Sequence, residues 1–93
     1  MQYEWSEDKE ILNIRKHGIS FDTAKTVWSD PAALEFYDDE HSDTEERFII
    51  IGKTPRGKTL FVIFCEKLEG EVIRIISARR ATINEKEQYE RQL

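Results

Sequence analysis

The sequence has little of what marks secreted, membrane-spanning or zinc-binding proteins. Its 93 residues include a single cysteine, Cys65, which excludes an internal disulfide and a cysteine-based zinc site. No apolar run approaches the roughly 18 residues that a membrane span requires, and the polar amino terminus carries no secretory signal. Four glycines and two prolines exclude the collagen-like and low-complexity classes. We therefore expect a cytoplasmic protein with no membrane partner.

The general motifs of nucleotide, metal and redox enzymes are also missing. The sequence contains no P-loop, no glycine-rich dinucleotide motif, no His-Glu-x-x-His and no Cys-x-x-Cys. Its length fits one small domain, so we expect residues 1–93 to form a single domain.

The charge of the chain is unevenly distributed. The net charge of −5 by itself argues against sequence-independent binding of nucleic acid. However, residues 38–46 hold six acidic residues and no Lys or Arg, and the rest of the chain carries 13 acidic and 14 basic residues. The acidity is thus a local block, which we expect to form an exposed loop, and the remainder is nearly neutral.

Apolar periodicity and turn residues predict eight elements in the order β-α-α-β-β-β-β-α. Ser6 and Gly18 bound the first helix, and Thr82 with Glu85 forms a capping box before the last. The expected elements are strands at 3–5, 33–37, 48–51, 60–65 and 72–76, and helices at 7–17, between Ser20 and Pro31, and at 83–92. The predicted fold class is α+β, a small antiparallel sheet with two amino-terminal helices and one carboxy-terminal helix.

Two expectations about packing follow from the same pattern. Ile11, Leu12 and Ile14 supply an apolar stripe on the first helix. The runs 48–51 and 60–65 are apolar at every position, which is typical of strands covered on both faces, or partly so.

A first cluster that can carry chemistry is Arg15-Lys16-His17-Gly18 at the end of the first helix. A histidine side chain titrates near neutral pH and can exchange protons in catalysis. The alternative is that these cations only complement the helix dipole.

A second cluster consists of Arg74, Arg79 and Arg80 in and just after the last apolar run. In a regular strand Arg74 and Arg80 point to one face, and Arg79 points to the other with Ser77. Guanidinium groups at a strand end suit bidentate contacts with phosphate, whereas the abundant acids offer salt bridges as the alternative.

Two further features allow a binding role. The acidic block with His41 could ligate Mg²⁺ or Ca²⁺, but a charge run of this kind is usually solvated. Tyr89 could stack on a base or donate a proton, and the alternative is that it docks the last helix.

Several stretches, in this order, resemble the BrnT family of bacterial toxins over almost the whole chain. They are Tyr3-Glu4-Trp5, Arg15-Lys16-His17-Gly18-Ile19-Ser20-Phe21, Asp30-Pro31, His41-Ser42 with Glu45-Glu46-Arg47 and Ile51-Gly52, and Arg74-Ile75-Ile76-Ser77-Ala78-Arg79-Arg80-Ala81 with Tyr89 downstream. The resemblance implies a toxin of a type II toxin–antitoxin system with a RelE-type fold. It also implies cleavage of RNA without a metal ion or other cofactor.

The resemblance further implies partners and site residues. The implied partner is a BrnA-like antitoxin with a ribbon-helix-helix DNA-binding part. The toxin would then be bound to operator DNA only through the antitoxin. The family motifs fall on Lys16, His17, Arg47, Arg79 and Arg80. We expect His17, Lys16, Arg79 and Arg80 to be catalytic, and we expect RNA to be bound by Arg47, Arg74 and Tyr89.

Two expectations about protein contacts complete the sequence interpretation. The antitoxin is expected to bind the cationic face through acidic residues that complement Arg79 and Arg80. The alternative to an enzyme is a non-enzymatic protein-binding module in which the arginines form salt bridges.

Overall fold

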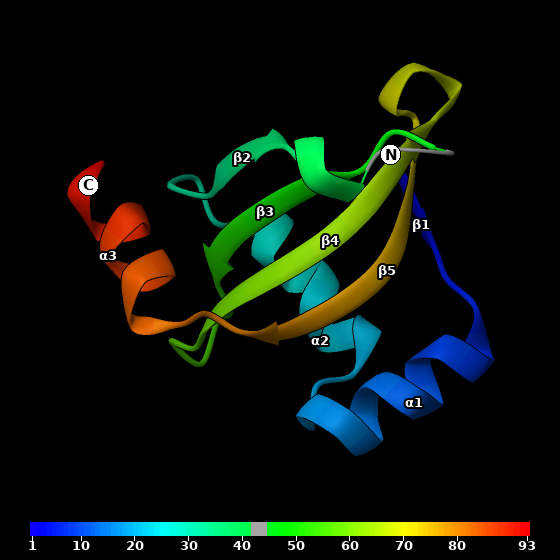
Figure 1. Ribbon diagram of the computed structural model, residues 1–93, viewed down its shortest axis with the longest axis horizontal. Helices are drawn as coiled ribbons and strands as arrows, with labels where there is room; N and C mark the ends of the chain where they lie inside the picture. Colours follow the sequence, from blue (N-terminus) through cyan, green and yellow to red (C-terminus); the bar gives the residue numbers. More distant parts are fainter. Residues whose placement is uncertain (42–44) are drawn as a thin grey trace.

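The structure, a computed structural model, describes residues 1–41 and 45–93 and has a five-stranded sheet at its centre (Figure 1). The strands are β1 (Gln2–Glu4), β2 (Leu34–Tyr37), β3 (Phe48–Lys53), β4 (Thr59–Lys67) and β5 (Val72–Arg80), in the spatial order β1-β5-β4-β3-β2. The helices are α1 (Glu7–His17), α2 (Phe21–Lys25) and α3 (Ile83–Arg91), with short 3-10 helices η1 (Thr26–Ser29), η2 (Asp39–His41) and η3 (Leu68–Gly70). None of the described helices is long and apolar enough to cross a membrane.

The expected α+β class is confirmed, and one strand pairing refines it. β2, β3, β4 and β5 pair antiparallel, as expected from the short turns that join β3, β4 and β5. β1 lies beside β5 and runs parallel to it, so the sheet is mixed. No hairpin sets the direction of β1, because α1 and α2 intervene before the chain returns at the far edge as β2.

The helix boundaries follow the capping residues in the sequence. The Ser6 side chain accepts a hydrogen bond from the backbone N–H of Lys9, and Gly18 ends α1 in the left-handed conformation that glycine favours. The second expected helix is α-helical only to Lys25 and tightens into η1 before Pro31. The capping box of Thr82 and Glu85 is present at the start of α3.

The apolar stripe that the sequence predicts on α1 is exposed. Ile11, Leu12 and Ile14 have exposed fractions of 51%, 62% and 44%, whereas the buried residue of α1 is Asn13. The hydrogen bonds of Asn13 account for this orientation and are described below.

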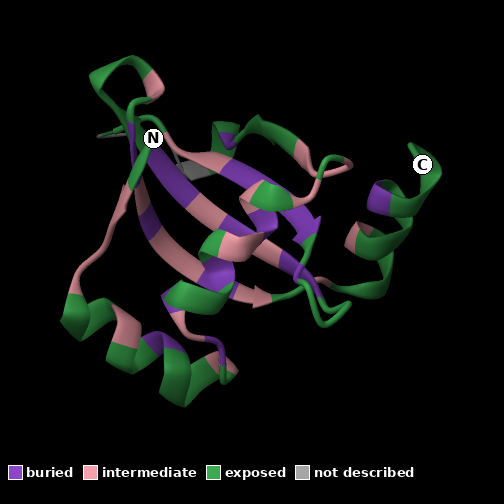
Figure 2. Cartoon of the chain, turned by 180° about the vertical axis from the view of Figure 1, so that it is seen from behind, coloured by how far each residue is buried: buried purple, intermediate pink, exposed green. Residues whose placement is uncertain are grey.

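The core is divided between the two faces of the sheet. The larger cluster lies on the α2 face, the face covered by α2 and η1, where Phe21, Ala24 and Val27 pack on the sheet (Figure 2). On the opposite face, the α3 face, Tyr89 packs against Ile49 and Ile51.

A bulge in β5 changes which arginines share a face. Ile63 pairs with Ser77 but Phe64 pairs with Ile75, so Ile76 is an extra residue in the ladder. Ile75 and Ala78 both reach the α2-face core although they are three residues apart. Arg74 therefore lies on the same face as Arg79 and not with Arg80, contrary to the expectation for a regular strand.

The acidic block is only partly an exposed loop. Asp39 and Glu40 are exposed, but Asp38 is buried, and its backbone N–H donates to the carbonyl of Arg47 at 2.8 Å. This bond joins the two ends of the block where β2 leaves the sheet and β3 enters it.

Candidate functional site

Asn13 fixes the position of α1 against the edge of β5. β1 pairs only with Val72 to Arg74, so the far half of β5 has an open edge, and Asn13 meets it there. Its Nδ2 donates to the carbonyls of Ala78 at 2.9 Å and Ile19 at 2.8 Å, and its Oδ1 accepts from the N–H of Ala78 at 3.1 Å. The sequence interpretation missed this residue. A polar residue inside the apolar stretch 11–14 is the signal that could have found it.

Lys16 and His17 lie one turn beyond Asn13, beside the same strand. Together with Leu12, Ile76 and Ser77 they line a shallow groove of about 210 Å³. Lys16 is exposed and His17 is half-buried. This arrangement leaves the ring accessible to a substrate that lies along the end of α1.

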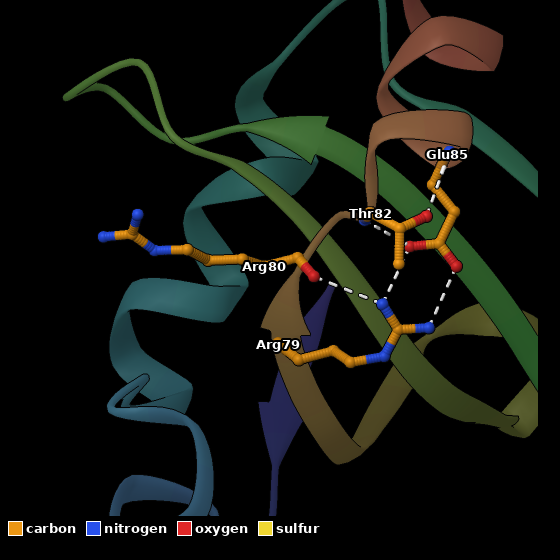
Figure 3. A network of polar contacts seen from close by, with 4 residues as sticks. All are labelled: Arg79, Arg80, Thr82 and Glu85. Atoms are coloured by element: carbon orange, nitrogen blue, oxygen red, sulfur yellow. Dashed lines mark hydrogen bonds and ion pairs between the residues drawn. The ribbon is translucent and has the colours of Figure 1, made fainter.

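Arg79 and Arg80 are adjacent in sequence but point to opposite sides of β5 (Figure 3). Arg80 is exposed and lines a hollow of about 260 Å³ with Lys58 and Lys86. Arg79 lies on the α3 face, with its guanidinium carbon 4.0 Å from the centre of the Phe61 ring. The structure therefore does not form a paired arginine site.

The guanidinium of Arg79 is already bound by a carboxylate. Its Nη1 and Nη2 donate to Oε1 and Oε2 of Glu85 at 2.7 and 2.9 Å. The same carboxylate accepts from the N–H of Thr82 in the capping box. The hydrogen bond from Arg79 holds the pKa of Glu85 below its usual value, and the bond to Glu85 raises the pKa of Arg79. For Arg79, the salt-bridge alternative of the sequence interpretation describes the structure.

Arg74 and Arg47 lie at the other end of the sheet. Arg74 Nη1 donates to Glu4 Oε2 at 2.9 Å, and Lys67 Nζ binds the same oxygen at 2.9 Å. These bonds lower the pKa of Glu4. Arg47 is half-buried just before β3, with its guanidinium 4.0 Å from Glu45. Neither arginine lies near the end of β5 that carries Arg80.

Tyr89 is part of the core in this structure, as in the docking alternative. Its exposed fraction is 2%, and its hydroxyl donates to Asp30 Oδ2 at 2.6 Å. Burial, with the hydrogen bond to Asp30, raises the pKa of Tyr89 to about 12. The ring is not available to stack on a base while α3 is docked.

Asp30 is a structural junction that the sequence interpretation named only as part of a motif. Besides the Tyr89 hydroxyl it accepts from the N–H groups of Ala32 at 2.9 Å and Lys53 at 2.8 Å. Burial by itself raises the pKa of Asp30, but the hydrogen bonds from Tyr89 and the backbone outweigh it and lower the pKa. Asp30 thus ties α3 to the end of β3.

The end of α1, the turn between β3 and β4, the end of β5 and the start of α3 lie at one end of the molecule (Figure 1). Cationic residues of these segments line three hollows there. A groove of about 530 Å³ joins Gly18 at the end of α1 to Arg56 and Lys58 in the β3–β4 turn, and Lys58 also lines the hollow of Arg80. We call this surface the cationic end; its residues are Lys16, His17, Arg56, Lys58, Arg80 and Lys86.

The cations of this surface differ from Lys67, Arg74 and Arg79 in how they are compensated. Within residues 1–41 and 45–93, no carboxylate forms an ion pair with any member of the cationic end, whereas Lys67, Arg74 and Arg79 are all paired. Cations without a carboxylate partner among the described residues provide charge for a polyanion, and an imidazole at the same end provides a group that exchanges protons. Lys58 and Lys86 were not predicted from the sequence, where isolated lysines carry no signal.

The described residues contain no group of three His, Cys, Asp or Glu side chains that could hold a metal ion. The acidic block, considered above as a possible Mg²⁺ or Ca²⁺ site, includes Ser42, Asp43 and Thr44, which lie outside the described residues.

Comparison with known proteins identifies the family. Residues 5–85 match the family model described as "Ribonuclease toxin, BrnT, of type II toxin-antitoxin system". The chain belongs to the BrnT family. It is therefore a ribonuclease toxin of a type II toxin–antitoxin system by family, as the motifs in its sequence predicted.

A solved structure supports the assignment to the BrnT family. The crystal structure of the Brucella abortus ribonuclease toxin BrnT is similar to this chain with a TM-score of 0.67 and 27% sequence identity. The alignment covers 88% of this chain and 97% of the Brucella protein. A search of curated protein sequences gave no match.

Proposed function

We propose that this BrnT family member cleaves RNA without a metal ion, and that the cationic end holds the RNA backbone. The observation that carries the proposal is the set of cations at one end of the molecule in a chain whose net charge is −5. Lys16 and His17 share the groove at the end of α1, and Lys58, Arg80 and Lys86 share the hollow at the end of β5. An acidic protein repels RNA overall, so a local cationic surface decides where RNA binds.

The proposed reaction uses the 2′-hydroxyl of the substrate as the nucleophile. The 2′-oxygen forms a bond to the adjacent phosphorus as its proton passes to a base. The bond from phosphorus to the 5′-oxygen breaks as that oxygen takes a proton from an acid. The products are a 2′,3′-cyclic phosphate and a free 5′-hydroxyl, and the charge of the pentacoordinate intermediate requires nearby cations.

The geometry supports different roles for the residues of the cationic end. His17 exchanges the proton as base or acid, because it lines the groove beside β5 and imidazole is the side chain most often used for general acid–base catalysis. Lys16 beside it stabilises the developing charge, and Arg80 with Lys58 binds phosphates further along the strand. A contact of Arg79 with phosphate requires the guanidinium to exchange Glu85 for the substrate.

The family assignment implies an antitoxin, and we propose its type. The antitoxin is BrnA-like, with a ribbon-helix-helix part that binds operator DNA, and the toxin meets that DNA through the antitoxin. The net charge of −5 on the toxin is compatible with this proposal, because the antitoxin and not the toxin then contacts the DNA.

RNA cleavage by the purified chain in EDTA tests the proposal. We expect cutting of a labelled RNA with a 2′,3′-cyclic phosphate on the upstream product, and no cutting when the nucleotide 5′ to the scissile phosphate is 2′-deoxy. Cleavage that disappears in EDTA and returns with Mg²⁺ would show that the metal-independent scheme is wrong.

A matched pair of charge reversals tests the location of the RNA. Lys58→Glu places an acid in the cationic end and should slow cleavage at low substrate concentration by at least about tenfold. Lys67→Glu makes the same change at the opposite end of β4, and we expect an effect of less than about threefold. Equal losses in the two variants would place the RNA elsewhere.

A further inference from the structure

The α3 face of the sheet is only partly covered. β3 and β4 carry apolar residues on both faces, whereas β5 presents Arg74, Ser77 and Arg79 to the α3 face. The α2 face is filled by α2 and η1. On the other face α3 packs mainly on β3. The short helix η2 lies beside the upper part of this face (Figure 1). Phe61 and Ile63 of β4 are half-buried on this face, where an antiparallel strand that faces water normally carries polar residues.

A groove of about 660 Å³ occupies the uncovered part of this face. Ile49, Phe61 and Ile63 form its apolar floor, and Phe36 on the edge strand β2 forms one wall. Phe36 has an exposed fraction of 39%. Aromatic side chains that are exposed around an apolar floor are the usual anchors of protein–protein contacts. We call this hollow the α3-face groove.

The rim of the α3-face groove is acidic. Asp39 and Glu40, both exposed, lie on η2 beside the Phe36 wall. On the other side Glu85 is already matched by Arg79, so that pair adds no net charge. An acidic rim repels phosphate and favours a partner that carries Lys or Arg next to its apolar contacts.

We infer that the α3-face groove docks an amphipathic segment of the antitoxin, with large apolar side chains on one side and basic side chains toward η2. This inference rests on the family assignment, which implies an antitoxin, and it goes beyond the proposed cleavage of RNA. It differs from the expectation of an acidic partner segment at Arg79 and Arg80: Glu85 already compensates Arg79, whereas Arg80 is exposed. RNA and antitoxin then use different surfaces, the cationic end and the α3-face groove.

Binding of the antitoxin to full-length variants tests the inference. The probe is the purified antitoxin encoded beside this chain, titrated calorimetrically against the wild-type chain and two groove variants. Phe36→Asp removes the aromatic wall, and the double variant Asp39→Lys with Glu40→Lys reverses the charge of the rim. Each should weaken binding by at least about tenfold.

Two control variants make the same changes away from the groove. Ile11→Asp removes an exposed apolar side chain of α1, and Glu69→Lys with Glu71→Lys reverses charges around η3. We expect both to bind the antitoxin within about twofold of wild type. Circular dichroism on heating checks that each variant folds. Asp39 and Glu40 are exposed, so their double variant should fold and can test the docking site even if Phe36→Asp does not fold.

RNA cleavage without antitoxin separates this inference from the proposed function. All four variants should cleave RNA as wild type does, because none alters the cationic end. A wild-type chain that does not cleave RNA contradicts the proposed function and leaves the comparison of affinities intact. Unchanged affinity in the groove variants, or equal losses in the controls, overturns the docking site. A wild-type dimer that Phe36→Asp dissociates also overturns it, because the occupant is then a second copy of the chain.

Discussion

Replacing Asn13 by alanine should remove the hydrogen bonds that hold α1 against β5 and so lower the free energy of unfolding. The substitution removes three hydrogen bonds and leaves the N–H and carbonyl of Ala78 and the carbonyl of Ile19 without their partner in a buried site. At about 1 kcal/mol for each bond, the free energy of unfolding should fall by about 3 kcal/mol. For a chain of this size that loss lowers the melting temperature by roughly 12–24 °C.

A second variant at the same position tests the direction of the hydrogen bonds. In Asn13→Asp the carboxylate faces the carbonyl oxygens of Ile19 and Ala78, so burial and the loss of two donor bonds raise the pKa of the new carboxyl group. An acid with a raised folded-state pKa destabilises the protein at neutral pH and regains stability as the pH falls through that pKa. The deficit of Asn13→Asp should therefore shrink between about pH 7 and about pH 5.

Urea denaturation followed by circular dichroism measures both effects. Asn84→Ala is the control, since Asn84 is exposed on α3, and its free energy of unfolding should stay within about 0.5 kcal/mol of wild type. The reasoning is refuted if Asn13→Ala unfolds within about 1 kcal/mol of wild type, or if Asn13→Asp becomes relatively less stable at low pH.

Three further predictions follow from single contacts. Tyr89→Phe should cost about 1–2 kcal/mol in urea denaturation. Because the pKa of Asp30 is lowered in the fold, its carboxylate stabilises the protein fully above about pH 3.9 and loses that contribution as the pH falls through the folded-state pKa. Tyr89→Phe removes one of the hydrogen bonds that lower this pKa, so acid unfolding should move to higher pH. Gly52→Ala would place a Cβ 3.1 and 3.2 Å from two neighbouring Cβ atoms and should lower the free energy of unfolding by about 1–3 kcal/mol, measured in the same way. Arg80→Ala should reduce the salt dependence of RNA binding by about one unit of slope, whereas Arg79→Ala, whose charge is already compensated, should leave the slope nearly unchanged in fluorescence titrations.

Local signals in the sequence predicted most of the fold. The bounds of α1 were predicted correctly because Ser6 and Gly18 act within one turn of the helix ends. The direction of β1 and the bulge in β5 were not predicted, because both depend on pairing with residues far away in sequence. Periodicity found the apolar stripe of Ile11, Leu12 and Ile14 but not its exposure, because it does not show what covers an apolar face.

The candidate site was predictable only in part. Lys16 and His17 are consecutive residues in the last turn of α1, and in the structure they line the same groove. Arg79 and Arg80 are neighbours in sequence but lie on opposite faces of a strand, and Glu85 forms an ion pair with Arg79. Lys58 reaches Arg80 through the pairing of β4 with β5, which no local pattern shows.

The pH dependence of RNA cleavage by His17→Gln and the wild-type chain tests the central claim most directly. Initial rates in EDTA from about pH 5 to about pH 9 cover the range in which an imidazole exchanges its proton. The account predicts that His17→Gln folds normally, because His17 ends a helix, but cleaves at least about 100-fold more slowly than wild type. Cleavage by His17→Gln within a few-fold of wild type, with the same pH profile, would show that His17 is structural and that the cationic end does not carry the chemistry proposed for it.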